Sequence, residues 1–291
     1  MRVRLVIVLI IFGLGRAVVA TAAEDTVERQ RIAGGGRVLY LELDASTWRP
    51  RGRISFGIAP TLRLKLASAG LRVTEDSSEP HDATLKVEYR EQRGKQISIN
   101  LFGTDITCLV RLDDPMDKEA MSLVIHESPS YTDLVNAPYV EVVEKLEANP
   151  YFYFLGEIVR ERMHTHVDTT GALIRALDQQ FNRELHPQPI TPLDTLVSPA
   201  ETFPDLDVHF SAAAQQNAVD ELGRLKDSRA VDLLERLTSH ANRLTRLNAV
   251  LALGQFDDPS IPPVMTRIAQ TDSDVEVRDA AANVLTRYSM H

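Results

Sequence analysis

The chain of 291 residues has almost no cysteine and none of the short motifs that mark common enzyme families. Cys108 is its only cysteine, which excludes an intramolecular disulfide and a cysteine-rich metal site. No Walker loop, dinucleotide-binding glycine fingerprint, Gly-x-Ser-x-Gly elbow or His-Glu-x-x-His motif occurs. The three glycines at 34–36 precede a predicted strand and lack a following Lys-Ser/Thr pair, so they are not a phosphate loop. The sequence therefore predicts a non-catalytic protein with no cofactor.

Basic residues are outnumbered by acidic ones, with 32 Lys and Arg against 41 Asp and Glu, for a net charge of −9. No basic stripe interrupts this excess of acid. A chain with this balance is poorly suited to bind nucleic acid or an anionic membrane surface. We therefore expect no nucleic-acid partner.

The one long apolar run lies at the start of the chain. Basic residues 1–4 precede an apolar stretch at 5–15, and small residues at 20–23 then offer cleavage sites, as in a secretory signal peptide. The apolar stretch would rise about 16 Å as a helix, too little for a bilayer core of about 30 Å. We expect cleavage of residues 1–23, which removes three arginines and takes the net charge from −9 to −12. The mature protein is then periplasmic or secreted, with no stable membrane span and, since no cysteine follows the run, no lipoprotein anchor.

Residues 37–184 are predicted to form an α+β domain behind a flexible lead-in at 24–36. The clearest signal is at 83–90, where apolar residues alternate with polar ones, which predicts a sheet with one buried and one wet face. Gly94 and the Asp-Asp-Pro at 113–115 indicate hairpin turns. We expect a mostly antiparallel sheet with helices on one face. The predicted strands and the first helix lie at 37–43, 60–69 (helix), 71–73, 83–90, 97–101, 106–110 and 121–127.

The rest of this domain is predicted to be helical, at 140–147 and in one long helix over 155–181. Between them, the aromatic run at 151–154 is interpreted as packing between helices, with a ligand pocket as the alternative. Cys108 shares the apolar row of a predicted strand and has no neighbouring histidine. That favours a buried small hydrophobe over a nucleophile.

One string in this domain contains residue types that bind metals. His164, His166 and Asp168 have a spacing that resembles the ligand spacing of metal-dependent hydrolases. On a helix, residues two apart lie about 200° apart, so the two histidines could not share a metal there, although a loop would weaken this objection. A metal-dependent hydrolase that uses these three residues is therefore the alternative to a non-catalytic function.

The segment 37–114 resembles small α/β domains of bacterial envelope proteins. The resemblance rests on a helix that ends Leu-x-Ser-Ala-Gly-Leu at 66–71 and on Asp-Ala-Thr-Leu-Lys-Val-Glu at 82–88 before a hairpin. Similar segments occur in the amino-terminal domain of the Tol-system translocation protein and in the lipopolysaccharide-assembly lipoprotein. The resemblance implies binding of envelope components and brings no catalytic residue.

The last part of the chain contains an internal repeat. Ala-Val-Asp-Glu-Leu-Gly at 218–223 recurs as Ala-Val-Leu-Ala-Leu-Gly at 249–254, and Ala-Ala-Asn-Val-Leu at 281–285 is a degraded copy. Equivalent leucines are 31 and 32 residues apart, a period typical of stacked helical pairs. The preceding segment, 185–210, is rich in proline and is predicted to be a semi-rigid linker. Within 211–291, helices are predicted at 212–225, 228–240, 244–255, 262–270 and 275–288.

These repeats resemble HEAT repeats of the short, phycobilisome-lyase-like type, and the segment 272–281 fits that consensus best. The resemblance implies a short all-α solenoid that binds a protein partner, and it does not imply bilin-lyase activity. Arg246 and Arg278 occupy the family's arginine position. The resemblance implies that they join a ladder of hydrogen bonds with acidic turn residues such as Asp272 or Asp274.

The repeat array is expected to end without a cap. Its five helices make two and a half repeats, fewer than the about three that an independent array needs. We therefore expect an uncovered apolar face on the final helix, which docks on the α/β domain, self-associates or binds another protein. The residues of this face are Val277, Ala281, Leu285 and Tyr288.

The function that these patterns predict is an exported, non-catalytic protein-interaction adaptor of the cell envelope. A subunit that only stabilises a larger enzyme would have the same sequence features.

Overall fold

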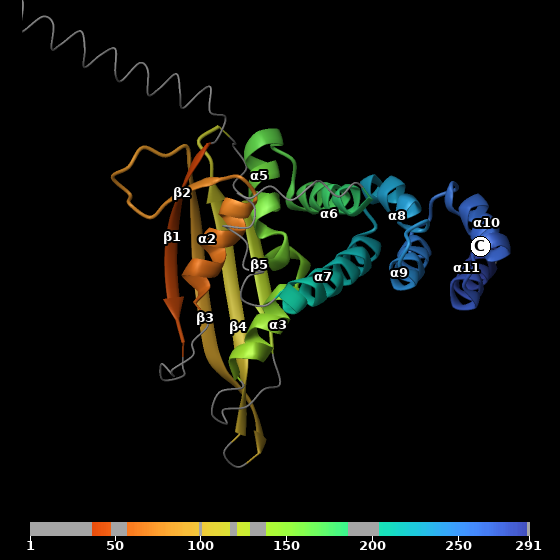
Figure 1. The fold of residues 1–291 in the computed structure, drawn as a ribbon, viewed down its shortest axis with the longest axis horizontal. Helices are drawn as coiled ribbons and strands as arrows, with labels where there is room; N and C mark the ends of the chain where they lie inside the picture. The colour runs from red at the N-terminus through yellow and green to blue at the C-terminus, as the bar shows by residue number, and fades with distance from the viewer. Residues whose placement is uncertain are drawn as a thin grey trace, which may run out of the picture.

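The computed structural model describes residues 37–47, 57–98, 101–116, 121–128, 138–185 and 204–289. The predicted signal peptide and lead-in, and residues 186–203 of the predicted linker, lie outside the described residues. The described part contains a sheet with helices packed on it, followed by a row of further helices (Figure 1). No helix in these ranges is both long and apolar enough to span a bilayer.

The sheet has five strands in the order β2-β1-β3-β4-β5. β1 pairs in parallel with both β2 and β3, whereas β3, β4 and β5 pair in an antiparallel way. The prediction of a mostly antiparallel sheet is therefore wrong for the β1 side. The chain passes from β1 to β2 through a helix, and such a crossover brings the second strand back in the same direction. The strands are β1 (Val38–Ser46), β2 (Arg72–Thr74), β3 (Ala83–Ser98), β4 (Leu101–Asp113) and β5 (Met121–Glu127).

One face of the sheet forms the core, as the alternating pattern predicts. Leu85 lies opposite Leu112, and Tyr89 lies opposite Cys108, with all four side chains buried. The Cys108 thiol is fully buried, and burial raises its pKa to about 12. These observations confirm that Cys108 is a small hydrophobic core residue.

The predicted turn at Gly94 is wrong, because β3 continues through it to Ser98. The pairing of β3 with β4 shifts register between Arg93 and Gln96, which is a β-bulge opposite Gly103. A Cβ atom on Gly94 would lie 3.1 Å from the backbone carbonyl carbon of Gly103. Glycine at this position therefore permits a close approach of two strands and does not reverse the chain.

The predicted long helix at 155–181 is two helices, α5 (Leu155–Thr165) and α6 (Thr169–Leu185). His166 takes a left-handed conformation, with φ of 52°, and ends α5. The Asp168 carboxylate then accepts a hydrogen bond of 2.7 Å from the N–H of Gly171 in the first turn of α6. The remaining helices of this half are α2 (Ile58–Ser68), α3 (Pro138–Ala148) and the single turn α4 (Pro150–Tyr153).

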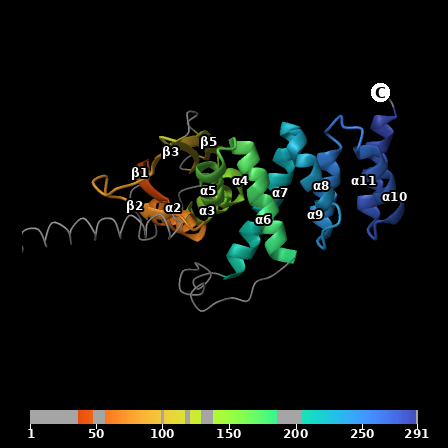
Figure 2. The same cartoon turned by 90° about the horizontal axis from the view of Figure 1, so that it is seen from above.

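All five helices predicted for the last part of the chain are present. The first of them begins at Pro204, so the final residues of the predicted linker are helical, and proline at the first helical position is well tolerated. α7, α9 and α11 stack side by side, and α10 packs on α11 (Figure 2). The elements are α7 (Pro204–Leu225), the 3-10 turn η3 (Ser228–Ala230), α8 (Val231–Leu237), α9 (Arg243–Leu253), α10 (Ile261–Thr271) and α11 (Val275–Tyr288).

The repeated glycine explains how these helices approach each other. A Cβ atom on Gly223 of α7 would lie 2.8 Å from the Cα atom of Ala252 in α9. A Cβ atom on Gly254, at the end of α9, would lie 2.5 Å from a methyl carbon of Val284 in α11. In the first two units, the Leu-Gly pair of the repeat therefore places one buried leucine and one close helix contact.

The helical row is joined to the sheet half through a continuous hydrophobic core. α7 packs against α3, α4 and α6. Tyr151 donates a hydrogen bond of 3.1 Å to Glu221, and Asn217 donates one of 2.6 Å to the carbonyl oxygen of Ala148. The aromatic run at 151–154 thus supports helix packing, since Phe152 and Phe154 are buried beside this contact.

Candidate functional site

The final helix does not expose the apolar face that the sequence predicts. Val277 and Ala281 are fully buried, and Leu285 and Tyr288 are half-buried, because α11 packs on both α9 and α10. The Tyr288 hydroxyl also donates a hydrogen bond to the carbonyl oxygen of Phe256. The expectation of an uncovered face is therefore wrong for these residues, while partner binding by this helix stays a prediction.

The exposed face of α11 is mostly polar. A polar outer face is what a terminal unit of a repeat array needs in order to remain soluble. The outer face of α11 is therefore suited to contact with solvent. Its exposed residues are Val275, Glu276, Asp279, Ala282, Asn283, Thr286 and Arg287.

The three candidate metal ligands lie at the junction of α5 and α6. His164 is in the last turn of α5, His166 ends that helix, and Asp168 precedes α6. The Asp168 carboxylate accepts hydrogen bonds of 3.0 and 2.8 Å from Arg229 of η3, and this hydrogen bonding lowers the pKa of Asp168. Across the described ranges, no group of three or more His, Cys, Asp or Glu side chains is placed to hold a metal ion. Asp168 therefore connects the first turn of α6 to Arg229 of the repeats through hydrogen bonds.

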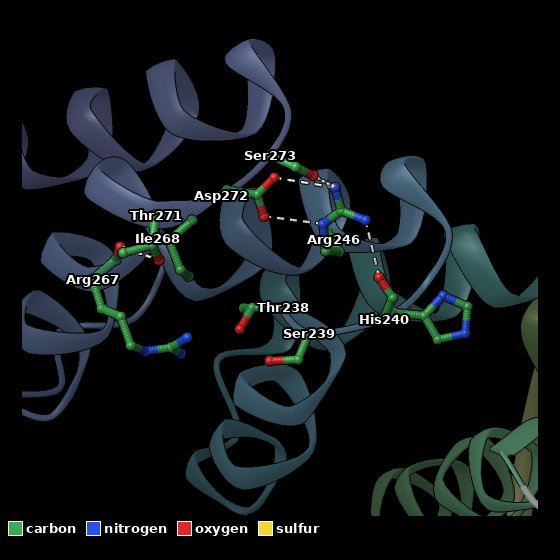
Figure 3. A pocket seen from close by; sticks show the side chains of 9 residues that line it. All are labelled: Thr238, Ser239, His240, Arg246, Arg267, Ile268, Thr271, Asp272 and Ser273. Carbon is green, nitrogen blue, oxygen red and sulfur yellow. Dashed lines mark hydrogen bonds and ion pairs between the residues drawn. The ribbon is translucent and has the colours of Figure 1, made fainter.

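A groove of about 340 Å³ lies between α8 and α10, next to the loops that follow them (Figure 3). Its walls are polar except for Ile268. The lining residues are Thr238, Ser239, His240, Arg246, Arg267, Ile268, Thr271, Asp272 and Ser273.

Arg246 and Asp272 line one side of this groove and are hydrogen-bonded to each other. The Arg246 guanidinium donates to the two carboxylate oxygens of Asp272 at 3.0 and 3.1 Å and to the carbonyl oxygen of His240 at 3.0 Å. Arg278 donates to the backbone oxygen of Asp272 at 2.7 Å. Burial alone would raise the pKa of Asp272, but the hydrogen bonds from Arg246 and from the Asp274 N–H hold it below its usual value. The ladder that the HEAT resemblance implies is confirmed for Arg246 and Asp272.

Arg267 is the groove's other cation, and its guanidinium has no hydrogen bond or ion pair with any described residue. Its side chain is exposed and extends across the groove toward Thr238 and Ser239 (Figure 3). Ser239 has no described side-chain hydrogen bond, and the Ser273 hydroxyl accepts one of 3.4 Å from Arg246, so its hydrogen is free to be donated. The groove thus presents two guanidinium groups and one carboxylate, with free hydroxyl donors between them.

Sequence reasoning identified Arg246 but not Arg267. The only signal for Arg267 in the sequence is that it stands 31 residues after Arg236, which is the repeat period. That signal identifies an equivalent position and says nothing about whether the arginine has a partner.

Comparison with known proteins identifies the class of the helical region. Residues 203–286 match the family model of HEAT repeats, and repeats of this class commonly mediate protein–protein interaction. No curated protein matches the chain. A solved structure of a minor lipoprotein from Acinetobacter baumannii is similar at 19% identity over 45% of this chain and 94% of that chain, with a TM-score of 0.24. A score this low supports no statement about a shared fold.

Proposed function

We propose that this protein is an exported, non-catalytic adaptor of the cell envelope, in which the HEAT repeats bind a protein partner and the sheet half binds an envelope component. The observation that carries the proposal is the block of HEAT repeats at 203–286. Export rests on the signal-peptide pattern of residues 1–23, and the envelope assignment rests on the resemblance of the segment 37–114. We also propose that the repeats form a short solenoid of the phycobilisome-lyase-like type.

The arrangement of the two halves supports this proposal. Because α7 packs on α3, α4 and α6, the repeats extend from the sheet half as a fixed projection. The sheet face opposite α2 and α5 carries exposed side chains, such as Lys86, Glu88 and Val124. One molecule therefore offers two separate surfaces at a fixed distance, as an adaptor requires.

Site-specific photo-crosslinking in the native cell envelope tests this function. A photoreactive residue replaces Thr271 in the groove, Val124 on the sheet face, or Asn283 on α11, one at a time. We expect a defined protein adduct from Thr271, and a different adduct or none from Val124. An absence of adducts from every position in the full-length protein would contradict the adaptor function.

Two further measurements separate the parts of this proposal. The mass of the mature protein should correspond to a start at Glu24 if the signal peptide is removed. Metal analysis of the purified protein addresses the hydrolase alternative. Stoichiometric zinc or iron that is lost in a His164→Ala/His166→Ala variant would favour that alternative over the adaptor.

A further inference from the structure

We propose that the groove between α8 and α10 receives a carboxylate from an acidic segment of the partner protein, with Arg267 as its anchor. This inference rests on the proposed protein-binding function and deepens it, because it names the chemistry that the repeats recognise.

The first argument compares two arginines that stand at equivalent positions of the repeat. Arg236 on α8 and Arg267 on α10 are 31 residues apart, and each precedes a buried aliphatic residue. Arg236 forms an ion pair of 2.8 Å with Asp178 on α6, the helix before it in the row. Across the groove from Arg267, the turn that follows α8 contributes Thr238 and Ser239 to the lining, and α8 contributes no carboxylate to it. Arg236 is therefore paired with an acidic residue of a neighbouring helix, whereas Arg267, at the equivalent position of the repeat, faces the groove.

The second argument is the charge of the groove in an otherwise acidic protein. The chain has a net charge of −9, yet the groove lining has two arginines and one aspartate, a net charge of +1. Arg246 neutralises the Asp272 carboxylate directly. An entering anion therefore meets Arg267 without opposition from a free carboxylate in the lining.

The third argument concerns the size and the charge of the ligand group. A volume of about 340 Å³ is large enough for one or two side chains. The groove also lies beside the carboxyl ends of α8 and α10, which carry partial negative charge. A singly charged carboxylate fits this setting better than a doubly charged phosphate. A guanidinium binds a carboxylate through two parallel hydrogen bonds, and the hydroxyls of Ser239 and Ser273 are additional donors.

A binding experiment on the full-length mature protein tests the proposal. The probe is a fluorescently labelled hexaglutamate peptide at low salt, measured by anisotropy, with a hexaglutamine peptide as the uncharged comparison. We expect binding of hexaglutamate only. The Arg267→Gln variant should bind it about tenfold more weakly, because a charge-assisted hydrogen bond is lost.

Arg287→Gln is the matched control. Arg287 is an exposed arginine without an ion pair to any described residue, and it lies about 18 Å along α11 from the end that borders the groove. Its replacement removes the same charge and should leave binding unchanged. Both variants should unfold at the same denaturant concentration as the wild type, since neither guanidinium has a described partner.

Three results would overturn the proposal. The first is equal binding by the wild type and Arg267→Gln, and the second is equal weakening by Arg267→Gln and Arg287→Gln, which would indicate general attraction to positive charge. The third is displacement of the peptide by inorganic phosphate at an equal concentration, which would make the groove a phosphate site. In each of these cases the adduct from Thr271 in the cell envelope could persist, so failure here is distinct from failure of the adaptor function.

Discussion

Replacement of Gly156 by alanine tests how tightly α5 and α2, two helices of the sheet half, pack against each other. Gly156 lies in α5 where this helix crosses α2. An added Cβ atom would lie 2.8 Å from the carbonyl carbon of Lys65, closer still to its oxygen, and 3.0 Å from the Cβ atom of Ala69. The obstacle is backbone, so no side-chain rotation relieves it. The two helices must move apart until the carbon atoms reach about 3.5 Å.

The size of the effect follows from two opposing contributions. Overpacking of a well-packed core costs about 1–3 kcal/mol, and a backbone obstacle belongs at the upper end of that range. Alanine gains about 1 kcal/mol over glycine in a helix. The net loss in the free energy of unfolding for Gly156→Ala is therefore about 2 kcal/mol. In a protein of this size the midpoint of thermal unfolding should fall by roughly 4–8 °C.

Urea and thermal unfolding followed by circular dichroism measure this loss. Gly171→Ala is the matched control, because its added Cβ atom would meet only side chains, Arg229 at 3.0 Å and Asp168 at 3.1 Å, and not a helix backbone. That control should lose much less stability than Gly156→Ala, because side chains can shift to relieve the contact and the helix preference for alanine, about 1 kcal/mol, opposes the remaining cost. A Gly156→Ala protein as stable as the wild type, or more stable, would refute the close contact of α5 with α2.

Three other predictions concern the polar groups and the cysteine. Arg246→Met should lower the free energy of unfolding by about 1–2 kcal/mol at pH 7. Because the folded protein lowers the pKa of Asp272, the part of this contribution that comes from the Asp272 carboxylate is present above the unfolded value of about 3.9 and is lost as the pH falls through the lower folded value, so the difference between the urea midpoints of variant and wild type should shrink in that acid range. Cys108, whose pKa burial raises to about 12, should react with iodoacetamide at pH 8 only in urea, and labelling of the native protein would contradict its burial. Arg236→Gln should cost about 0.5 kcal/mol, whereas Arg267→Gln should cost nothing, and equal losses would show that Arg267 has a partner.

The sequence predicted the helices of the last part of the chain well because their pattern repeats. A fixed period of 31 or 32 residues places leucine, small residues and turn residues in the same positions of each unit, and each local signal agrees with the others. The buried face of the sheet was equally accessible, since alternation along one strand decides which side chains point inward.

Strand direction and helix breaks were harder to predict. The alternation in β1 is the same whether its neighbours run parallel or antiparallel, so the pattern contains no information on direction. Apolar residues keep a helical spacing across the α5–α6 junction, from Met163 to Val167, and this continuity hid the break. The signal that was available is Asp168 followed by Gly171, which is suited to begin a new helix.

The candidate site was the least predictable part. Counting helices suggested an uncovered end, but coverage of Val277 and Ala281 depends on how α10 and α11 meet, which no single-helix pattern describes. Arg267 faces the groove because no carboxylate lies opposite it. Which residues of two helices lie opposite each other cannot be deduced from the pattern of either helix alone. The fit of the segment 37–114 to envelope domains stays a prediction.

The contact between α6 and α7 affects how this protein behaves after proteolytic cleavage. Gln180 of α6 donates a hydrogen bond of 2.6 Å to Ser211 of α7, and Gln215 of α7 donates one to Glu184 of α6. These bonds join the chain on either side of residues 186–203. A single proteolytic cut within that segment should therefore yield two fragments that elute together at the intact mass and separate only under denaturing conditions. A digest analysed only under denaturing conditions would therefore suggest two domains, although the described residues share one hydrophobic core.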